Sequence, residues 1–162
     1  MGVQFSADEI FEMAEQMERN GAKFYRKAAD AVEDKSEAGI LLDLAAMEED
    51  HEKTFAAMRK ELSGGEVEPT AFDPQGEAAL YLQAFADGHV FDPKADPSEK
   101  LTGKETLDDI LRIAIGLEKD SIVFYLGIRD AVKKKQGKEK VDDIIKEEMS
   151  HVTGLSKQLS AL

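Results

Sequence analysis

Two stretches that lie 100 residues apart decide the fold of this chain: LAAMEEDHEKTF at residues 44–55 and IIKEEMSHVTGL at residues 144–155. Each contains a Glu-x-x-His sequence, at 48–51 in the first stretch and at 148–151 in the second. Apolar residues recur alternately three and four positions apart around both sequences, which is the pattern of helices that pack in a bundle. The glutamate and the histidine occupy positions on this apolar stripe where leucine is expected.

The two stretches are part of a longer internal repeat. When the sequence is shifted by 100 residues, it matches itself without a gap over roughly 55 positions, which is typical of a duplicated unit. The matched pairs include Asp8 and Asp108, Glu18 and Glu118, Tyr25 and Tyr125, Glu48 and Glu148, and His51 and His151. We therefore predict two related helical hairpins, at 6–62 and 106–162, joined by a crossover at 63–105 within one domain.

Capping residues predict where the helices begin and end. Ser6 and Thr106 occupy the same repeat position, and each begins a capping box or a close variant of one. Glycines at 64, 65 and 137 are expected to end or interrupt helices. The predicted helices are about 6–33, from 36 to before Gly64, about 106–134, and from beyond Gly137 to near the C-terminus.

The crossover differs from the hairpins in composition, because it contains all four prolines of the chain. Asp73-Pro74 is a good helix start and Gly88 a good stop, so we expect a short helix at about 74–87. Asp96-Pro97 is expected to lie in an extended loop before the next helix. The crossover must carry the chain back along a bundle ~40 Å tall, since about 27 residues rise 1.5 Å each in a helix.

The composition excludes several classes of protein. The 162 residues include 34 acidic and 21 basic residues, and this formal charge of −13 argues against nucleic acid or an anionic membrane as the main partner. Without cysteine there can be no disulfide, thiolate metal site or iron–sulfur cluster. The chain has no run of about 18 apolar residues that could span a membrane. No signal segment opens it, so we expect a cytosolic protein.

Six ionisable side chains stand on the apolar stripes of the predicted helices: Glu18, Glu48, His51, Glu118, Glu148 and His151. Burying one unpaired carboxylate costs several kcal/mol, and four together would repel one another. No lysine or arginine falls on these stripes near the acids, whereas two divalent cations would balance four glutamates and neutral histidines. Oxygen and imidazole ligands without sulfur suit iron, manganese or zinc.

The expected heights of these residues in the bundle favour one shared site. In an antiparallel hairpin, Glu18 lies about 15 residues before the corner and Glu48 about 12 after it, so their heights differ by ~5 Å. Within Glu-x-x-His, the two side chains lie about 60° apart on neighbouring turns and can bind one ion. Tyr25 and Tyr125 each follow a stripe glutamate by seven residues. Their hydroxyls could donate to a ligating carboxylate, and ordinary core packing is the alternative.

Other polar side chains near the motifs have simpler interpretations. Glu15, Glu49 and Glu147 flank the motifs but lie off the stripes, so we expect them on a solvated face. His89 in the crossover is interpreted as a surface or loop histidine. The six methionines are interpreted as packing residues, because oxygen ligands make a hard environment.

Together these residues resemble the di-metal carboxylate motif of ferritin-like proteins, in which two helices each supply one Glu and the other two each supply Glu-x-x-His. The surroundings of Glu18 to Tyr25 and of Glu118 to Tyr125 most resemble the rubrerythrin group. The resemblance covers both hairpins and implies an all-α, ferritin-like four-helix bundle with a di-iron site. By the same resemblance, each iron would have one terminal glutamate, Glu18 or Glu118, and one histidine, His51 or His151. Glu48 and Glu148 would bridge the two ions.

Two departures from the rubrerythrin pattern bear on activity. Rubrerythrins end in a rubredoxin domain with a Cys-bound iron, whereas this chain has no cysteine, so we expect an external electron donor such as a rubredoxin-like protein. Rubrerythrins also carry an additional Glu three residues after the ligand of the third helix. Here that position is Ser121, and its repeat partner is Gly21. The resulting set of four Glu and two His is closer to that of bacterioferritins or manganese catalases, and the small residues are expected to leave space for a small oxidant or a water.

The resemblance implies a cytosolic di-iron oxidoreductase that reduces peroxide or O₂, with a role in oxidative stress. Three alternatives stay open: iron binding and storage in a multi-subunit shell, a manganese catalase, and a metal site that only stabilises a partner-binding bundle. A homodimer is expected as well, because the predicted crossover helix offers Tyr81 and Phe85 as contacts.

Overall fold

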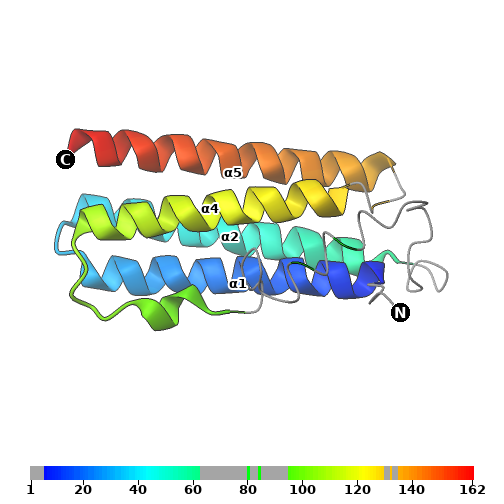
Figure 1. Ribbon diagram of the computed structural model, residues 1–162, viewed down its shortest axis with the longest axis horizontal. Helices are drawn as coiled ribbons and strands as arrows, with labels where there is room; N and C mark the ends of the chain where they lie inside the picture. Colours follow the sequence, from blue (N-terminus) through cyan, green and yellow to red (C-terminus); the bar gives the residue numbers. More distant parts are fainter. Residues whose placement is uncertain (1–5, 63–79, 81–83, 85–94, 130–131, 133–134) are drawn as a thin grey trace.

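The computed structural model describes residues 6–62, 80, 84, 95–129, 132 and 135–162. Its long helices are α1 (Ala7–Ala31), α2 (Lys35–Lys60), α4 (Leu107–Arg129) and α5 (Lys135–Ala161), with a short 3-10 helix, η1 (Pro97–Lys100), before α4. The long helices run side by side and form the predicted all-α four-helix bundle (Figure 1). In the described part of the chain, no helix is both long enough and apolar enough to cross a membrane.

The helices pair as the repeat predicts. Within the first hairpin α1 contacts α2, and within the second α4 contacts α5. Across the bundle α1 contacts α4 and α2 contacts α5. Residues from all four helices therefore meet along the bundle axis, where the stripe positions point.

The first helix of each hairpin begins with the predicted capping chemistry. The backbone N–H of Glu9 donates to Ser6 Oγ at 3.2 Å, and the Ser6 N–H donates to the Glu9 carboxylate at 2.8 Å. Thr106 and Asp109 form the same two bonds, at 3.2 and 3.0 Å. The reciprocal bonds satisfy backbone donors that a helix start otherwise leaves free.

The second helix of each hairpin begins earlier than predicted. α2 begins at Lys35 because Asp34 is its N-cap and accepts from the backbone N–H groups of the second and third helical residues. Gly137 does not interrupt the chain before α5 but lies in the first turn of that helix. A Cβ at Gly137 would lie 2.6 Å from Val132 Cγ1, so the glycine permits Val132 to lie close to the start of α5.

Most of the crossover lies outside the described residues. Of the short helix expected at 74–87, the structure describes Leu80 and Ala84, and both are helical. Three further residues with predicted roles lie outside the described part: Tyr81, Phe85 and His89.

The end of the crossover, η1, packs against α1 and replaces part of the expected extended loop. Asp96 is its N-cap and also forms an ion pair with Lys23. Lys27 Nζ donates to the Ser98 carbonyl at 2.7 Å, and Asn20 Nδ2 donates to the Ala95 carbonyl at 3.1 Å. These bonds hold η1 beside the middle of α1.

Two apolar clusters fill the interior, one on each side of a polar layer. Along α1, one cluster extends to Ala14 and the other begins at Phe24. Along α2, Leu44 belongs to the second cluster and Phe55 to the first, as an antiparallel neighbour requires. The polar stripe residues lie between the clusters, so they are enclosed by apolar side chains from both ends of the bundle.

Candidate metal centre

The structure buries all six of the stripe residues. Their exposed fractions are 1% for Glu18, 4% for Glu48, 3% for His51, 3% for Glu118, 0% for Glu148 and 5% for His151. α1 and α4 each supply one glutamate, while α2 and α5 each supply a Glu-x-x-His pair. The sequence places them there because each lies on the buried stripe of its helix.

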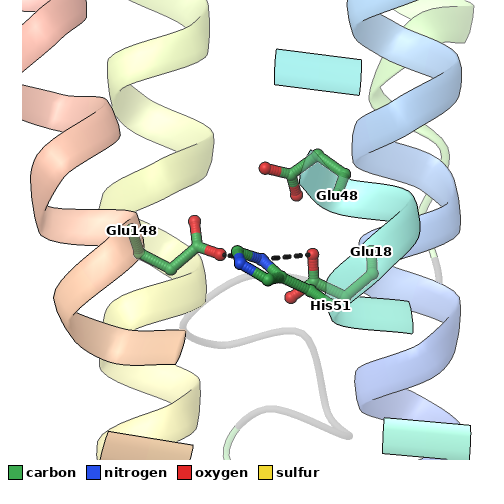
Figure 2. A group of neighbouring side chains, drawn as sticks. All are labelled: Glu18, Glu48, His51 and Glu148. Atoms are coloured by element: carbon green, nitrogen blue, oxygen red, sulfur yellow. Dashed lines mark ion pairs between the residues drawn. The ribbon is translucent and has the colours of Figure 1, made fainter. Parts of the chain in front are cut away.

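The first of two metal-ligand groups contains Glu18, Glu48, His51 and Glu148, each with one ligand atom within 4.8 Å of the others. Figure 2 shows the His51 ring between the carboxylates of Glu148 and Glu18. His51 Nδ1 lies 2.8 Å from Glu148 Oε1 and 3.5 Å from Glu18 Oε2. The group thus gathers three helices around one point.

The second group contains Glu48, Glu118, Glu148 and His151 under the same distance limit. His151 Nδ1 lies 3.4 Å from Glu118 Oε2, 3.5 Å from Glu48 Oε1 and 3.6 Å from Glu148 Oε2. The two imidazole rings are stacked with centroids 5.9 Å apart. Glu48 and Glu148 belong to both groups, so the six residues form two adjacent positions that share two carboxylates.

The donor set has more negative charge than the described side chains balance. Among the described residues, the bases that form ion pairs with these glutamates are His51 and His151. Several buried atoms make no hydrogen bond: Glu18 Oε2, Glu48 Oε1, both Glu148 carboxylate oxygens and His51 Nδ1. Buried acceptors of this kind are costly unless a cation or a proton compensates them. The residues therefore fit two divalent cations.

Burial and mutual repulsion shift the protonation of the glutamates. Burial raises the pKa of Glu18 well above its ordinary value, and the charges of Glu48 and Glu148 raise it further. Burial also raises the pKa of Glu148 to about 8. The pKa of Glu118 is lowered instead, because its close contacts with Glu148 and His151 outweigh its burial.

The histidines respond in the opposite sense. Burial by itself lowers the pKa of each imidazole, but the nearby carboxylates, above all Glu148 at His51 and Glu118 at His151, outweigh it and raise the pKa of both histidines to about 12. Protons on the imidazoles and on Glu148 occupy the atoms that a metal ion would bind. Metal ions and protons therefore compete for this centre.

Two buried tyrosines bind the outer glutamates, each from the opposite hairpin. The Tyr25 hydroxyl donates to Glu118 Oε1, and the Tyr125 hydroxyl donates to Glu18 Oε1. Burial raises the pKa of both hydroxyls well above the usual value, so they remain donors. The sequence indicated a bond to a carboxylate but not its crossed direction. These bonds hold Glu18 and Glu118 in place from outside the ligand groups.

One contact was not predicted from the sequence. Glu147 is about half exposed, with 53% of its side chain accessible, yet its Oε2 lies 2.7 Å from His51 Nε2. The apolar stripe of the helix does not indicate this contact, because Glu147 lies off the buried face. The signal that could have found it is an acid directly before Glu148, since metal-binding histidines commonly donate their second N–H to a carboxylate.

The other two flanking acids also have partners. Arg26 forms an ion pair with Glu49, which is partly exposed. The expected solvated position is wrong for Glu15, whose side chain is 13% exposed and lies 3.6 Å from Arg59. Arg59 spans from α2 to several acids on α1 and so covers Glu15.

A cavity of about 140 Å³ lies between α1, α4 and the η1 segment. Its lining runs from exposed Lys100 to the buried carboxylates of Glu48 and Glu118, and it includes both Gly21 and Ser121. A Cβ at Gly21 would lie 2.9 Å from Glu48 Oε2, so a larger residue here would force the Glu48 carboxylate to move. The small residues thus border a cavity beside the carboxylates, as expected from the sequence.

Comparisons with known proteins bear on the family and the fold of the chain. The family model Rubrerythrin matches residues 9–159. A candidate ferritin-like diiron-carboxylate protein from Thermotoga maritima has a similar crystal structure, with a TM-score of 0.70 and 22% identity over 97% of this chain and 96% of that chain. At that identity the likeness bears on the fold alone. No curated protein matches the chain.

Proposed function

We propose a function from one premise: this chain belongs to the rubrerythrin family. Its two ligand groups would hold two metal ions, iron first, with manganese or zinc as the alternatives that the same donors suit. The centre would reduce peroxide or O₂ with electrons from an external donor. The observation that carries this proposal is the pair of overlapping, buried Glu/His groups.

The proposed ligand roles follow from which residues the groups share. Glu18 and His51 occur in the first group alone, and Glu118 and His151 in the second alone. They would each bind one ion. Glu48 and Glu148 occur in both groups and would bridge the two ions.

Two iron ions, when bound, would supply the two electrons that, with two protons, reduce one H₂O₂ to two H₂O, and the external donor would restore them. The protein residues would then orient the ligands and admit the oxidant. Tyr25 and Tyr125 hold the outer glutamates by hydrogen bonds. The apolar clusters above and below exclude bulk water from the carboxylates.

The cavity beside Gly21 and Ser121 supports a small oxidant as the substrate. An apolar cavity of about 150 Å³ can hold benzene, so a space of this size admits peroxide or O₂ readily. Its inner end touches Glu48 and Glu118. Substrates much larger than benzene would not reach these carboxylates without movement of α1, α4 or η1.

Stopped-flow mixing tests the proposed reaction. Protein loaded anaerobically with two Fe²⁺ per chain is mixed with H₂O₂, and oxidation is followed by absorbance. We expect oxidation faster than that of free Fe²⁺, with one peroxide consumed per chain and no O₂ released. Oxidation no faster than that of free Fe²⁺ would contradict the redox function, and O₂ release from the manganese-loaded protein would favour a catalase instead.

The external electron donor, the homodimer and the cytosolic location remain part of this proposal. They rest on the sequence and on the family. Size-exclusion chromatography with light scattering measures the mass directly, and a large shell in place of a dimer would favour iron storage.

A further inference from the structure

The two histidines of the centre have different surroundings at their outer nitrogens. His51 Nε2 lies 2.7 Å from Glu147 Oε2, across the boundary between the two hairpins. His151 Nε2 is buried, and among the described residues it has no hydrogen-bond partner. The inner nitrogens, by contrast, both face carboxylates of the ligand groups.

The internal repeat explains this difference. The repeat partner of His51 is His151, and the repeat partner of Glu147 is Met47. Met47 lies directly before Glu48, as Glu147 lies directly before Glu148, and it is 41% exposed. A thioether cannot replace the carboxylate as a strong acceptor. The second hairpin therefore gives His51 a partner that the first hairpin does not give His151.

The rest of the ligand arrangement follows the repeat closely. Each outer glutamate accepts from the tyrosine of the other hairpin. Each histidine belongs to one group, and each group has one outer glutamate and the same two shared glutamates. Against this matched background, the carboxylate of Glu147 is a difference that bears on one histidine only.

A carboxylate at Nε2 has a known effect on a metal-binding imidazole. The Nε2–H donates a hydrogen bond to the carboxylate, which places the lone pair on Nδ1 and fixes the orientation of the ring. It also makes Nδ1 a more basic ligand for a metal ion. Loss of such a partner typically lowers metal affinity by about 10- to 100-fold. His151 lacks this support, because its buried Nε2 has no hydrogen-bond partner among the described residues.

We propose that Glu147 is a positioning residue that makes the two metal positions unequal, so that the position with Glu18 and His51 binds its ion more tightly and fills first. This inference rests on the proposed two-metal function. It concerns the order of loading, which the family resemblance leaves open.

Metal titration tests the proposal without any assay of activity. The probe is Co²⁺ added anaerobically to the metal-free protein, followed by calorimetry and by the visible spectrum. For the unmodified chain we expect two binding events whose dissociation constants differ by about tenfold or more. In Glu147→Gln the tighter event should weaken by about 10- to 100-fold while the weaker event stays unchanged.

A second variant tests the converse. Met47→Glu places a carboxylate at the repeat position, where it can accept from His151 Nε2, and we expect the weaker event to become tighter. A merely structural role of Glu147 predicts no such gain at the other position. Glu49→Gln is the matched control, because Glu49 also flanks a motif but forms its ion pair with Arg26. It should leave both binding events unchanged.

The outcomes separate this inference from the proposed function. Two events of equal affinity in the unmodified chain, or equal weakening of both events in Glu147→Gln, would overturn it while leaving a two-metal centre intact. Two unequal events in a protein that does not react with H₂O₂ would support it and contradict the redox function. Failure to bind two ions would overturn both.

Discussion

Tyr25 and Tyr125 illustrate what single residues of this chain reveal in advance. Their position seven residues after a stripe glutamate indicated a bond to a carboxylate, and spacing within one helix fixes height along the bundle. It does not fix which hairpin supplies the partner, so the crossed bonds to Glu118 and Glu18 became clear from the structure. Glu147 lies on the solvated face expected for it, but its contact with His51 was not predicted, for a related reason. The carboxylate of a half-exposed glutamate can contact a buried imidazole, and helical periodicity predicts the face on which a residue lies but not such a contact.

At the residue scale, Gly21→Ala separates metal binding from folding. The new Cβ would lie 2.9 Å from Glu48 Oε2 and displace a carboxylate that both ligand groups share. We expect the affinity for both ions to fall by roughly tenfold, or about 1.4 kcal/mol. The metal-free protein should lose no stability and can gain up to about 1 kcal/mol, because Ala favours a helix over Gly. Calorimetric metal titration and urea unfolding measure the two effects.

Gly154→Ala is the control for this substitution. Gly154 lies in α5 close to His151, and a Cβ there would meet nothing within 4 Å. It should show the helix-propensity gain with unchanged metal affinity. If the two alanine variants behave alike in metal titration, the close approach of Gly21 to Glu48 has no role in the centre.

The helices were the most predictable level of organisation. The Ser6 and Thr106 caps predicted the starts of α1 and α4 to within one residue, because local chemistry sets a helix start. The end of α4 was placed too late, at about 134, since Val132 is not helical. α5 was less predictable, since Gly137 is tolerated in a first turn when Val132 packs against it. η1 was not anticipated because its position depends on bonds to α1 from residues about 70 positions away.

At the element scale, Ser121→Leu tests the cavity between α1, α4 and η1. The larger side chain should fill space beside Glu48 and Glu118 without changing a ligand. We expect unchanged metal content and a rate of reaction with H₂O₂ that falls by about tenfold, equivalent to about 1.4 kcal/mol in the barrier. Azide binding to the oxidised centre, followed by absorbance, should weaken in parallel.

Ser150→Leu provides the comparison for the cavity variant. Ser150 is an exposed residue of α5 between Glu148 and His151, so the substitution adds the same side chain outside the cavity. It should leave the peroxide and azide reactions unchanged. Equal rates for the two leucine variants would show that the oxidant does not pass through this cavity.

The whole molecule combines two conflicting requirements. Its apolar clusters exclude water from the middle of the bundle, and its repeat places four carboxylates in that same layer. The sequence predicted this conflict because the acids fall on apolar stripes. The sequence could not predict which of the buried glutamates and histidines bind protons in the absence of metal. Their pKa values depend on distances between helices, which the spacing along one helix does not give.

At the scale of the whole molecule, we expect the stability of the metal-free protein to fall as the pH rises. The pKa of Glu148 is raised from 4.5 to about 8 by burial, so the folded state favours the protonated carboxyl. Its contribution to stability is complete below pH 4.5 and is lost as pH rises through about 8. We therefore expect the Tm of the metal-free protein to fall between pH 6 and pH 9.

Metal loading should reverse that trend. Ions bind the ionised carboxylates and compete with protons, so the gain in Tm on loading should increase with pH over the same range. Differential scanning calorimetry of metal-free and Zn²⁺-loaded protein measures both curves. A metal-free Tm that rises toward pH 9, or a gain on loading that shrinks, would contradict this description of the buried acids.

The central claim is that the six buried side chains hold two adjacent divalent cations. Anomalous X-ray diffraction from crystals of the metal-loaded protein tests it most directly. We predict two anomalous peaks about 3.5–4 Å apart, one contacting Glu18 and His51, the other Glu118 and His151, with Glu48 and Glu148 between them. A single peak, peaks bound elsewhere on the chain, or no peak at this layer would contradict the claim.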